Sequence, residues 1–198
     1  MFFVSNYNVI YTNHRAHNDS EGDSIALGVK EWEDIKLWIR KAQELTPECS
    51  IILHGVSMGA ASVLSACDEE ICSEVSFIVA DCGFVSAEKQ LEYIVRGMKV
   101  PLFPAFNFCK YWFERYAKVK LSSKTALSAV KNSKTPILFI HGKKDRFVPI
   151  EMGKQLYEAC SSEKDFLWVD GAGHGSSYFI NRKAYEEKYA QFTERYCK

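Results

Sequence analysis

Hydrophobic residues along the chain fall into short apolar runs and longer stretches with helical spacing. The short runs predict β-strands at 7–11, 50–54, 76–80, 136–141 and 165–169. The longer stretches predict amphipathic helices at 28–45, 58–67, 150–161 and 181–196. Continuous apolar strands that alternate with helices are typical of a parallel sheet covered on both faces. The pattern therefore predicts an α/β fold of three layers, with about five mostly parallel strands.

Residues 86–132 interrupt this alternation between the third and fourth predicted strands. The segment has helical spacing and two prolines, Pro101 and Pro104, so we expect a small helical insertion. It also contains a cluster of aromatic residues: Phe103, Phe106, Phe108, Tyr111, Trp112 and Phe113. These side chains could line an apolar pocket for a substrate or pack in a core, and the sequence leaves both open.

The composition fits one globular domain that spans residues 1–198. Of the 198 residues, 47% are hydrophobic and 25% are charged, which excludes a disordered chain. The 25 basic and 25 acidic residues give a formal net charge of zero, which disfavours nucleic acid as a partner. No apolar run approaches the roughly 20 residues of a membrane helix, and residues 1–6 do not resemble a signal peptide. We expect a cytoplasmic protein without stable membrane insertion.

Neither the cysteines nor the glycine motifs predict a metal or a cofactor. The seven cysteines are an odd number without a CxxC pair, so we expect reduced thiols rather than a disulfide framework or a zinc site. Neither GxGxxG nor GxxxxGK[ST] follows a predicted strand, so a nucleotide-binding protein is the weaker alternative.

Residues 55–59, with the sequence GVSMG, join the strand at 50–54 to the helix at 58–67. In so tight a turn from strand to helix, the central residue has a strained backbone and its neighbours must be small. The turn would expose the Ser57 hydroxyl at the carboxyl edge of the sheet and direct the Met58 amide toward an oxyanion. We therefore predict Ser57 as a nucleophile and Met58 as an oxyanion donor. The alternative is a glycine-rich turn with an incidental serine.

A serine nucleophile needs a base, and the sequence offers five histidines. His174 is the favoured base because it lies in a glycine-rich loop, GAGHG, directly after the last predicted strand. His54 and His141 end strands just before glycines, so we expect them to be structural. His14 and His17 lie in a polar loop, where contact with substrate is a weaker possibility.

The base in turn needs an acid to orient it. Asp145 follows the strand at 136–141 and is the favoured acid, with Asp81 at the end of the preceding strand in reserve. The resulting chain order is Ser57, Asp145 and His174. This order of nucleophile, acid and histidine is the one found in α/β-hydrolases.

With these residues the sequence resembles the α/β-hydrolase superfamily, and in particular the bacterial group that includes serine aminopeptidases and prolyl-oligopeptidase-like enzymes. The resemblance implies Ser57 as nucleophile, Asp145 as acid and His174 as base. We expect no cofactor and no metal. The resemblance also implies a cap at 86–132 and small-molecule ester or peptide substrates that are cleaved through an acyl-enzyme. The residues that carry the resemblance lie at 15–17, 20–22, 54–60, 140–142, 145, 147–149 and 172–174.

The amino-terminal end departs from this resemblance. Related proteins begin with several strands before the one predicted here at 7–11, and a His-Gly loop among them donates a second amide to the oxyanion. We therefore expect a version that is shortened at the N-terminus and lacks the first strands of the family. The alternative function is a truncated remnant whose catalysis is impaired or lost.

Overall fold

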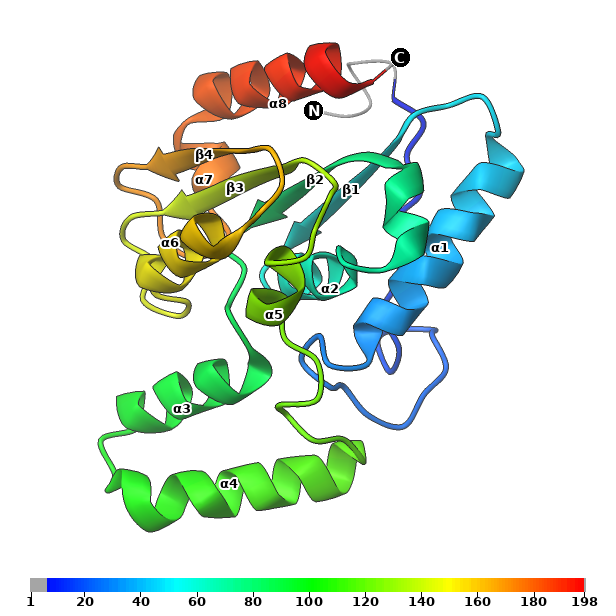
Figure 1. The fold of residues 1–198 in the computed structure, drawn as a ribbon. Coiled ribbons are helices and arrows are strands. Elements are labelled where there is room, and N and C mark those ends of the chain that lie inside the picture. The colour runs from blue at the N-terminus through cyan, green and yellow to red at the C-terminus, as the bar shows by residue number, and fades with distance from the viewer. Residues whose placement is uncertain (1–6, 198) are drawn as a thin grey trace.

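A computed structural model of the protein describes residues 7–197, in which the strands form one parallel sheet (Figure 1). Its spatial order is β1-β2-β3-β4, and each neighbouring pair is parallel. The strands are β1 (Ile51–Val56), β2 (Val75–Asp81), β3 (Ile137–Gly142) and β4 (Lys164–Val169). These four elements confirm the strands predicted at 50–54, 76–80, 136–141 and 165–169, with small differences in their ends.

Helices precede, separate and follow the strands. The four long helices expected from the sequence are all present, and the first begins three residues later than predicted because residues 27–30 form a turn. The helices are α1 (Glu31–Leu45), α2 (Met58–Ala66), α3 (Ala87–Gly97), α4 (Leu102–Ala117), α5 (Ala126–Val130), α6 (Ile150–Ala159), α7 (Ser177–Ile180) and α8 (Arg182–Tyr196), with the 3₁₀ helix η2 at Glu70–Glu74.

The sheet is buried on both faces, which makes the fold three-layered. Alternate residues of β2 belong to different cores, because side chains along a strand point to opposite faces. Ile78 and Ala80 pack with residues of α1, α2, α5 and α6, whereas Phe77 and Val79 pack beneath α8. Two covered faces explain why the strands are continuously apolar in sequence. The three-layered α/β fold with a parallel sheet, expected from the sequence, is therefore present.

The prediction of a strand at 7–11 is wrong. These residues form no ladder, and within residues 7–197 strand β1 pairs with β2 alone, so the described sheet has four strands and not five. Tyr7 packs edge-on against Tyr189, with ring centroids 5.8 Å apart. In contrast, Val9, Ile10 and Tyr11 are between 39% and 92% exposed, so most of this apolar run is neither paired in the sheet nor buried.

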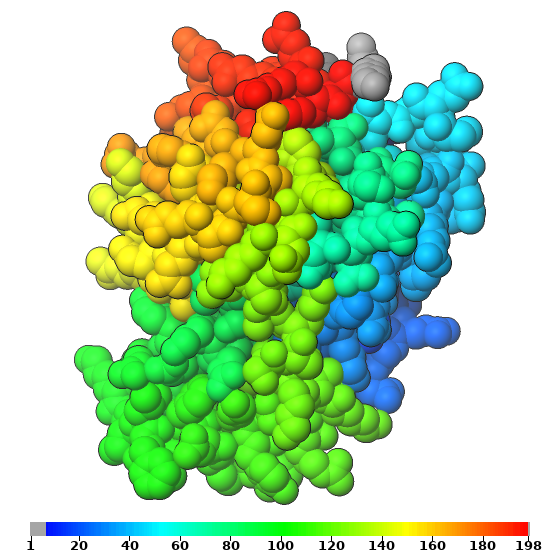
Figure 2. All heavy atoms as spheres, in the orientation of Figure 1, coloured from blue at the N-terminus to red at the C-terminus, as the bar shows by residue number. Residues whose placement is uncertain are grey.

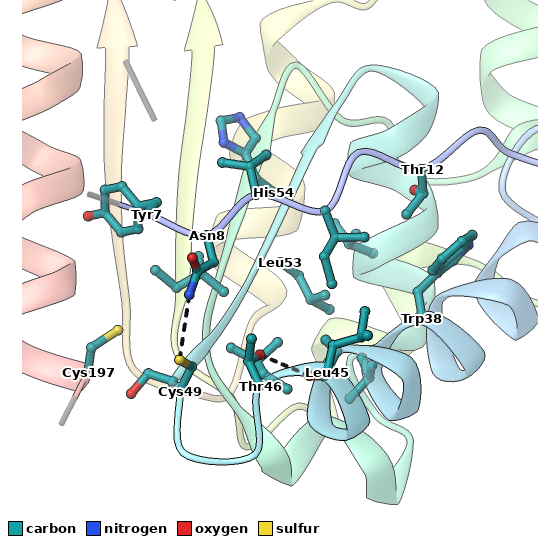
Figure 3. Close-up of a pocket in the computed structure, with 18 of the residues that line it drawn as sticks. Tyr7, Asn8, Thr12, Trp38, Leu45, Thr46, Cys49, Leu53, His54 and Cys197 are labelled. Atoms are coloured by element: carbon teal, nitrogen blue, oxygen red, sulfur yellow. Dashed lines mark hydrogen bonds between the residues drawn. The ribbon is translucent and has the colours of Figure 1, made fainter. Parts of the chain in front are cut away.

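Residues 7–12 form one side of a groove of about 560 Å³ along the outer edge of β1 (Figure 3). Trp38 and Leu45 of α1 and Leu53 and His54 of β1 also line it. None of the predicted site residues lines this groove, so it is separate from the candidate active site.

The helical insertion contains α3, α4 and α5, and α3 and α4 form an antiparallel pair beyond the sheet (Figure 1). Neither expectation for its aromatic cluster holds in full. Phe113 packs against a small core with Leu121, as core packing predicts. In contrast, Phe103, Phe108, Tyr111 and Trp112 are between 54% and 79% exposed, so they line no closed pocket.

No helix within residues 7–197 is both long enough and apolar enough to cross a bilayer. The expectation that residues 1–6 carry no signal peptide lies outside the described residues.

Candidate active site

Ser57 occupies the turn between β1 and α2, with φ of 55° and ψ of −116°. A positive φ is strained for any residue with a Cβ atom. The turn is fixed from the neighbouring strand, because the Ser57 N–H donates a hydrogen bond of 2.8 Å to the Asp81 carbonyl. The strain predicted for this position is therefore present, and it holds the hydroxyl at the carboxyl edge of the sheet.

The first glycine of the motif is required by the close approach of two backbone segments. A Cβ atom on Gly55 would lie 2.3 Å from the carbonyl carbon and oxygen of Gly59. At Gly59 itself the nearest atom to such a Cβ is 3.8 Å away, on His14, so space does not demand glycine there. The two glycines of the motif thus have unequal roles.

We expect Gly55→Ala to lower the free energy of unfolding by about 3 kcal/mol or more, because backbone atoms in the turn cannot move aside. Chemical denaturation measures this loss. Gly97→Ala is the matched control: a Cβ there meets nothing within 4 Å, and alanine favours the helix by up to about 1 kcal/mol. Equal stability of the two variants would contradict the tight turn.

Three predicted site residues meet at one edge of the sheet. The Ser57 Oγ lies 2.9 Å from Nε2 of His174, and Nδ1 of His174 lies 2.8 Å from Oδ2 of Asp145. Asp145 follows β3 and its side chain is fully buried, whereas His174 follows β4 and its side chain is 29% exposed. The structure therefore brings together side chains that are far apart in the sequence, in the arrangement of nucleophile, base and acid.

The charge on Asp145 determines which nitrogen of His174 carries a hydrogen. Burial alone would raise the pKa of Asp145, but the nearby ring of His141, whose Nε2 lies 3.5 Å from Oδ2, and hydrogen bonds from His174 and the backbone N–H groups of Val148 and Phe147 hold it well below its usual value. The ionised carboxylate can only accept, so Nδ1 of His174 donates to it. Nε2 is then the acceptor that faces the hydroxyl of Ser57.

Close packing between two loops positions His174. A Cβ atom on Gly142, at the end of β3, would lie 2.4 Å from the Ala172 carbonyl oxygen. The Lys144 N–H donates a hydrogen bond of 2.8 Å to the same oxygen. The loop that carries Asp145 is thus attached directly to the loop that carries His174.

Asp81, the reserve acid, has a different partner. Its Oδ1 accepts a hydrogen bond of 3.2 Å from the hydroxyl of Ser177, which begins α7 after the His174 loop. Burial raises the pKa of Asp81 to about 6, although the bond from Ser177 opposes the shift. The hydrogen bond to His174 comes from Asp145, so the geometry favours the first choice of acid over the reserve.

The other histidines lie where structural roles explain them. Nε2 of His141 donates to the Val148 carbonyl at 2.9 Å, and a Cβ atom on Gly153 of α6 would lie 2.6 Å from its ring. Nε2 of His54 lies 3.1 Å from the Tyr185 hydroxyl, and burial lowers the pKa of His54 to about 4.

The loop histidines interact mainly with each other and with the backbone. The rings of His14 and His17 lie 6.1 Å apart, and Nδ1 of His17 lies 2.9 Å from the Arg15 carbonyl. Burial lowers the pKa of His14, which favours the neutral form of its ring.

Sequence reasoning missed Phe147 as a member of the site. Its ring lies 4.9 Å from the ring of His174 and is 51% exposed. A phenylalanine two residues after an aspartate carries no signal of such a contact. The ring is tilted by 56° to the imidazole and adds an apolar surface beside His174.

Met58, the predicted oxyanion donor, is the first residue of α2. Its N–H therefore has no acceptor inside the helix and lies at the positive end of the helix dipole. This position suits stabilisation of a negatively charged oxygen next to Ser57.

Cys82, Asp145 and His174 offer ligand atoms within 4.8 Å of one another, which is the spacing of a candidate metal site. Burial raises the pKa of the Cys82 thiol to about 12, so it stays protonated and is neither a good ligand nor a nucleophile. Asp145 and His174 are already hydrogen-bonded to each other. Asp145 and His174 therefore fit a hydrogen-bonded triad with Ser57 better than they fit a metal site with Cys82.

Residues 39–175 match the model of the family described as "Serine hydrolase (FSH1)". The chain belongs to this serine hydrolase family. The match covers β1 to β4 and includes Ser57, Asp145 and His174.

This serine hydrolase chain is also similar in sequence to several individual proteins. It is 26% identical to the uncharacterized protein YqkD of Bacillus subtilis, over 98% of this chain and 64% of the relative. It is 27% identical to human alpha/beta hydrolase domain-containing protein 17C, over 79% of this chain and 38% of the relative. It is 26% identical to the uncharacterized membrane protein YNL320W of Saccharomyces cerevisiae, over 78% of this chain and 49% of the relative. The chain thus spans less than two thirds of each relative.

Solved structures show the same fold. The Pyrococcus furiosus esterase Pf2001 superimposes with a TM-score of 0.74 at 22% identity, over 98% of this chain and 73% of the esterase. The Pyrococcus horikoshii acylaminoacyl peptidase superimposes with a TM-score of 0.66 at 18% identity, over 86% of this chain and 28% of the peptidase. These two likenesses confirm the α/β-hydrolase-like fold that the sequence predicted.

Proposed function

We propose that the protein is a serine hydrolase that cleaves ester or amide bonds of small substrates through an acyl-enzyme on Ser57. The observation that carries this proposal is the continuous hydrogen-bonded chain from Ser57 Oγ through His174 to Asp145. Membership of a serine hydrolase family supports the same chemistry.

In the first half of the reaction, Nε2 of His174 removes the proton of Ser57 as Oγ attacks the carbonyl carbon of the substrate. The ionised carboxylate of Asp145 stabilises the imidazolium that forms. The imidazolium then protonates the leaving alcohol or amine, and the bond to the leaving group breaks. The product of this step is an ester between the substrate acyl group and Ser57.

In the second half, water replaces the leaving group. His174 takes a proton from the water, whose oxygen attacks the acyl carbon, and then returns the proton to Ser57 Oγ. The acid product is released and the three side chains regain their starting state. Each tetrahedral intermediate carries a negative oxygen that the Met58 N–H can stabilise, and one such donor is typically worth about 10²–10³ in kcat.

Structural neighbours suggest the substrate class. One is named an esterase and another an acylaminoacyl peptidase, so both ester and amide bonds fall within the chemistry of this fold. The exposed ring of Phe147 beside His174 favours an apolar group next to the scissile bond. We propose small esters or acylated peptides as substrates.

Labelling with a fluorophosphonate probe tests the proposal, because such probes react covalently with activated serines. We expect one labelled site, which mass spectrometry maps to Ser57, and no labelling of the Ser57→Ala variant. A folded wild-type protein that remains unlabelled would overturn the proposal and favour a form with impaired catalysis.

A further inference from the structure

Helix α4 presents apolar residues on both of its sides. Phe113 and Ala117 face the small core shared with α3 and the segment before α1. The opposite side, which we call the outer face of α4, is exposed to solvent. It consists of Pro104, Phe108, Tyr111, Trp112 and Arg115, which recur at intervals of three and four residues.

The outer face is an ordered aromatic surface. Phe108, Tyr111 and Trp112 are between 54% and 64% exposed. The Trp112 ring lies 5.5 Å from the ring of Tyr111 and 6.1 Å from that of Phe108, so the three rings form one cluster. Three adjacent exposed aromatic rings are unusual for a solvated helix and point to an interaction surface.

Positive charge surrounds this surface. Residues 96–124 hold seven basic side chains and one acidic side chain, a formal charge of +6 in a chain whose net charge is zero. Lys110 and Arg96 pair with Glu88 and Glu92 of α3, and Lys120 and Lys124 also have acidic partners.

Three of these cations remain uncompensated. Among residues 7–197, Lys99, Arg115 and Lys118 take part in no ion pair and are exposed. Lys99 precedes α4, whereas Arg115 and Lys118 lie at its carboxyl end. The outer face of α4 therefore has positive charge at both ends.

The position of α4 leaves this face free to meet a large surface. Figure 1 shows α3 between α4 and the sheet, and Figure 2 shows the α3–α4 segment, in green, as the lower end of the molecule. From α3, Gln90 donates to the Phe147 carbonyl at 2.8 Å and Tyr93 donates to the Arg146 carbonyl at 3.2 Å. The helix pair is thus attached to the loop that holds Asp145.

We propose that the outer face of α4 docks the protein on an anionic lipid surface. Tryptophan, tyrosine and phenylalanine insert at the boundary between headgroups and acyl chains, and flanking arginine and lysine bind anionic headgroups. Docking is peripheral and requires no membrane-spanning helix. It goes beyond the proposed hydrolase activity and would hold the cap and the adjacent site close to lipid.

A second copy of the chain suits this face less well. A twofold contact would bring the outer face of α4 against itself, with Lys99, Arg115 and Lys118 of both copies around the same patch. Like charges in such a contact repel, whereas an anionic bilayer attracts them. The charge therefore favours lipid as the occupant.

Flotation with lipid vesicles tests the proposal. We expect the wild-type protein to float with vesicles of phosphatidylcholine and phosphatidylglycerol in equal amounts, and much less with phosphatidylcholine alone. High salt should weaken the binding. The combined variant Lys99→Gln, Arg115→Gln and Lys118→Gln should bind about 100-fold more weakly, since each cation contributes about fivefold. Phe108→Ser, Tyr111→Ser and Trp112→Ser together should reduce binding at least tenfold.

Matched controls separate a docking surface from a general effect of charge or aromatic content. Arg40→Gln, Lys134→Gln and Lys154→Gln together change the net charge equally but lie outside the cap, and Tyr11→Ser with Phe179→Ser removes exposed rings elsewhere. Both should bind as the wild type does. Thermal unfolding checks that every variant is folded, and the Ser57→Ala background separates binding from catalysis.

Three outcomes would overturn the proposal. The first is failure of the wild type to bind anionic vesicles. The second is wild-type affinity in both combined variants of the cap. The third is a dimer in analytical ultracentrifugation that the aromatic variant abolishes, which would assign the face to a second copy.

Discussion

Replacing Ser57 with alanine is expected to lower kcat for an activated ester by about 10⁵- to 10⁶-fold. The proposed acyl-enzyme needs the oxygen that lies 2.9 Å from Nε2 of His174, and no other nucleophile on the described chain is hydrogen-bonded to that nitrogen. Only water could then attack the bound substrate. Steady-state hydrolysis of a p-nitrophenyl ester measures the loss.

The control for this experiment is Ser73→Ala, which changes an exposed serine in η2 far from the site. It should retain wild-type kcat. Alanine and serine both carry a Cβ atom, so the positive φ at position 57 strains both residues equally. The thermal unfolding temperature of Ser57→Ala should therefore stay close to that of the wild type. Retention of more than a tenth of the wild-type activity would show that Ser57 is not the nucleophile.

Asp145→Asn is expected to lower kcat by about 10⁴-fold with little change in KM. The amide cannot stabilise the imidazolium, and its NH₂ group would donate to Nδ1 of His174. The ring would then carry its hydrogen on Nε2, which could no longer accept the proton of Ser57. The same ester assay, together with substrate-saturation curves, separates kcat from KM.

Asp81→Asn provides the comparison, because Asp81 is also a buried carboxyl at a strand end but bonds to Ser177 instead of His174. We expect a far smaller fall in kcat. The reverse ranking of the two variants would make Asp81 the acid and refute the role of Asp145.

The catalytic geometry could be predicted because it depends on where strands end. Ser57, Asp145 and His174 each follow a short apolar run, and the carboxyl ends of parallel strands lie at one edge of a sheet. Local sequence therefore placed these side chains on one edge. It could not predict that Ser177 anchors to Asp81 or that Phe147 packs beside His174, because both contacts arise from loop packing.

The segment at 7–11 and the aromatic residues of α4 show the limit of apolar patterns. A pattern identifies residues that favour contact, but the partner depends on tertiary structure. Tyr7 packs against Tyr189 without pairing in the sheet. Trp112 lies at the surface, although its pattern allowed either a core or a pocket. Strand pairing and burial were therefore beyond what the sequence could decide.

At position 57, the residue needed for catalysis is not the residue that would make the fold most stable. The positive φ of Ser57 stores about 1–3 kcal/mol of strain, whereas glycine would adopt the same turn freely at an entropic cost of about 0.5–1 kcal/mol. A library selected only for heat resistance would then accumulate glycine at position 57 and lose its reactive hydroxyl. Survival of serine in such a library would need a second selection, for turnover.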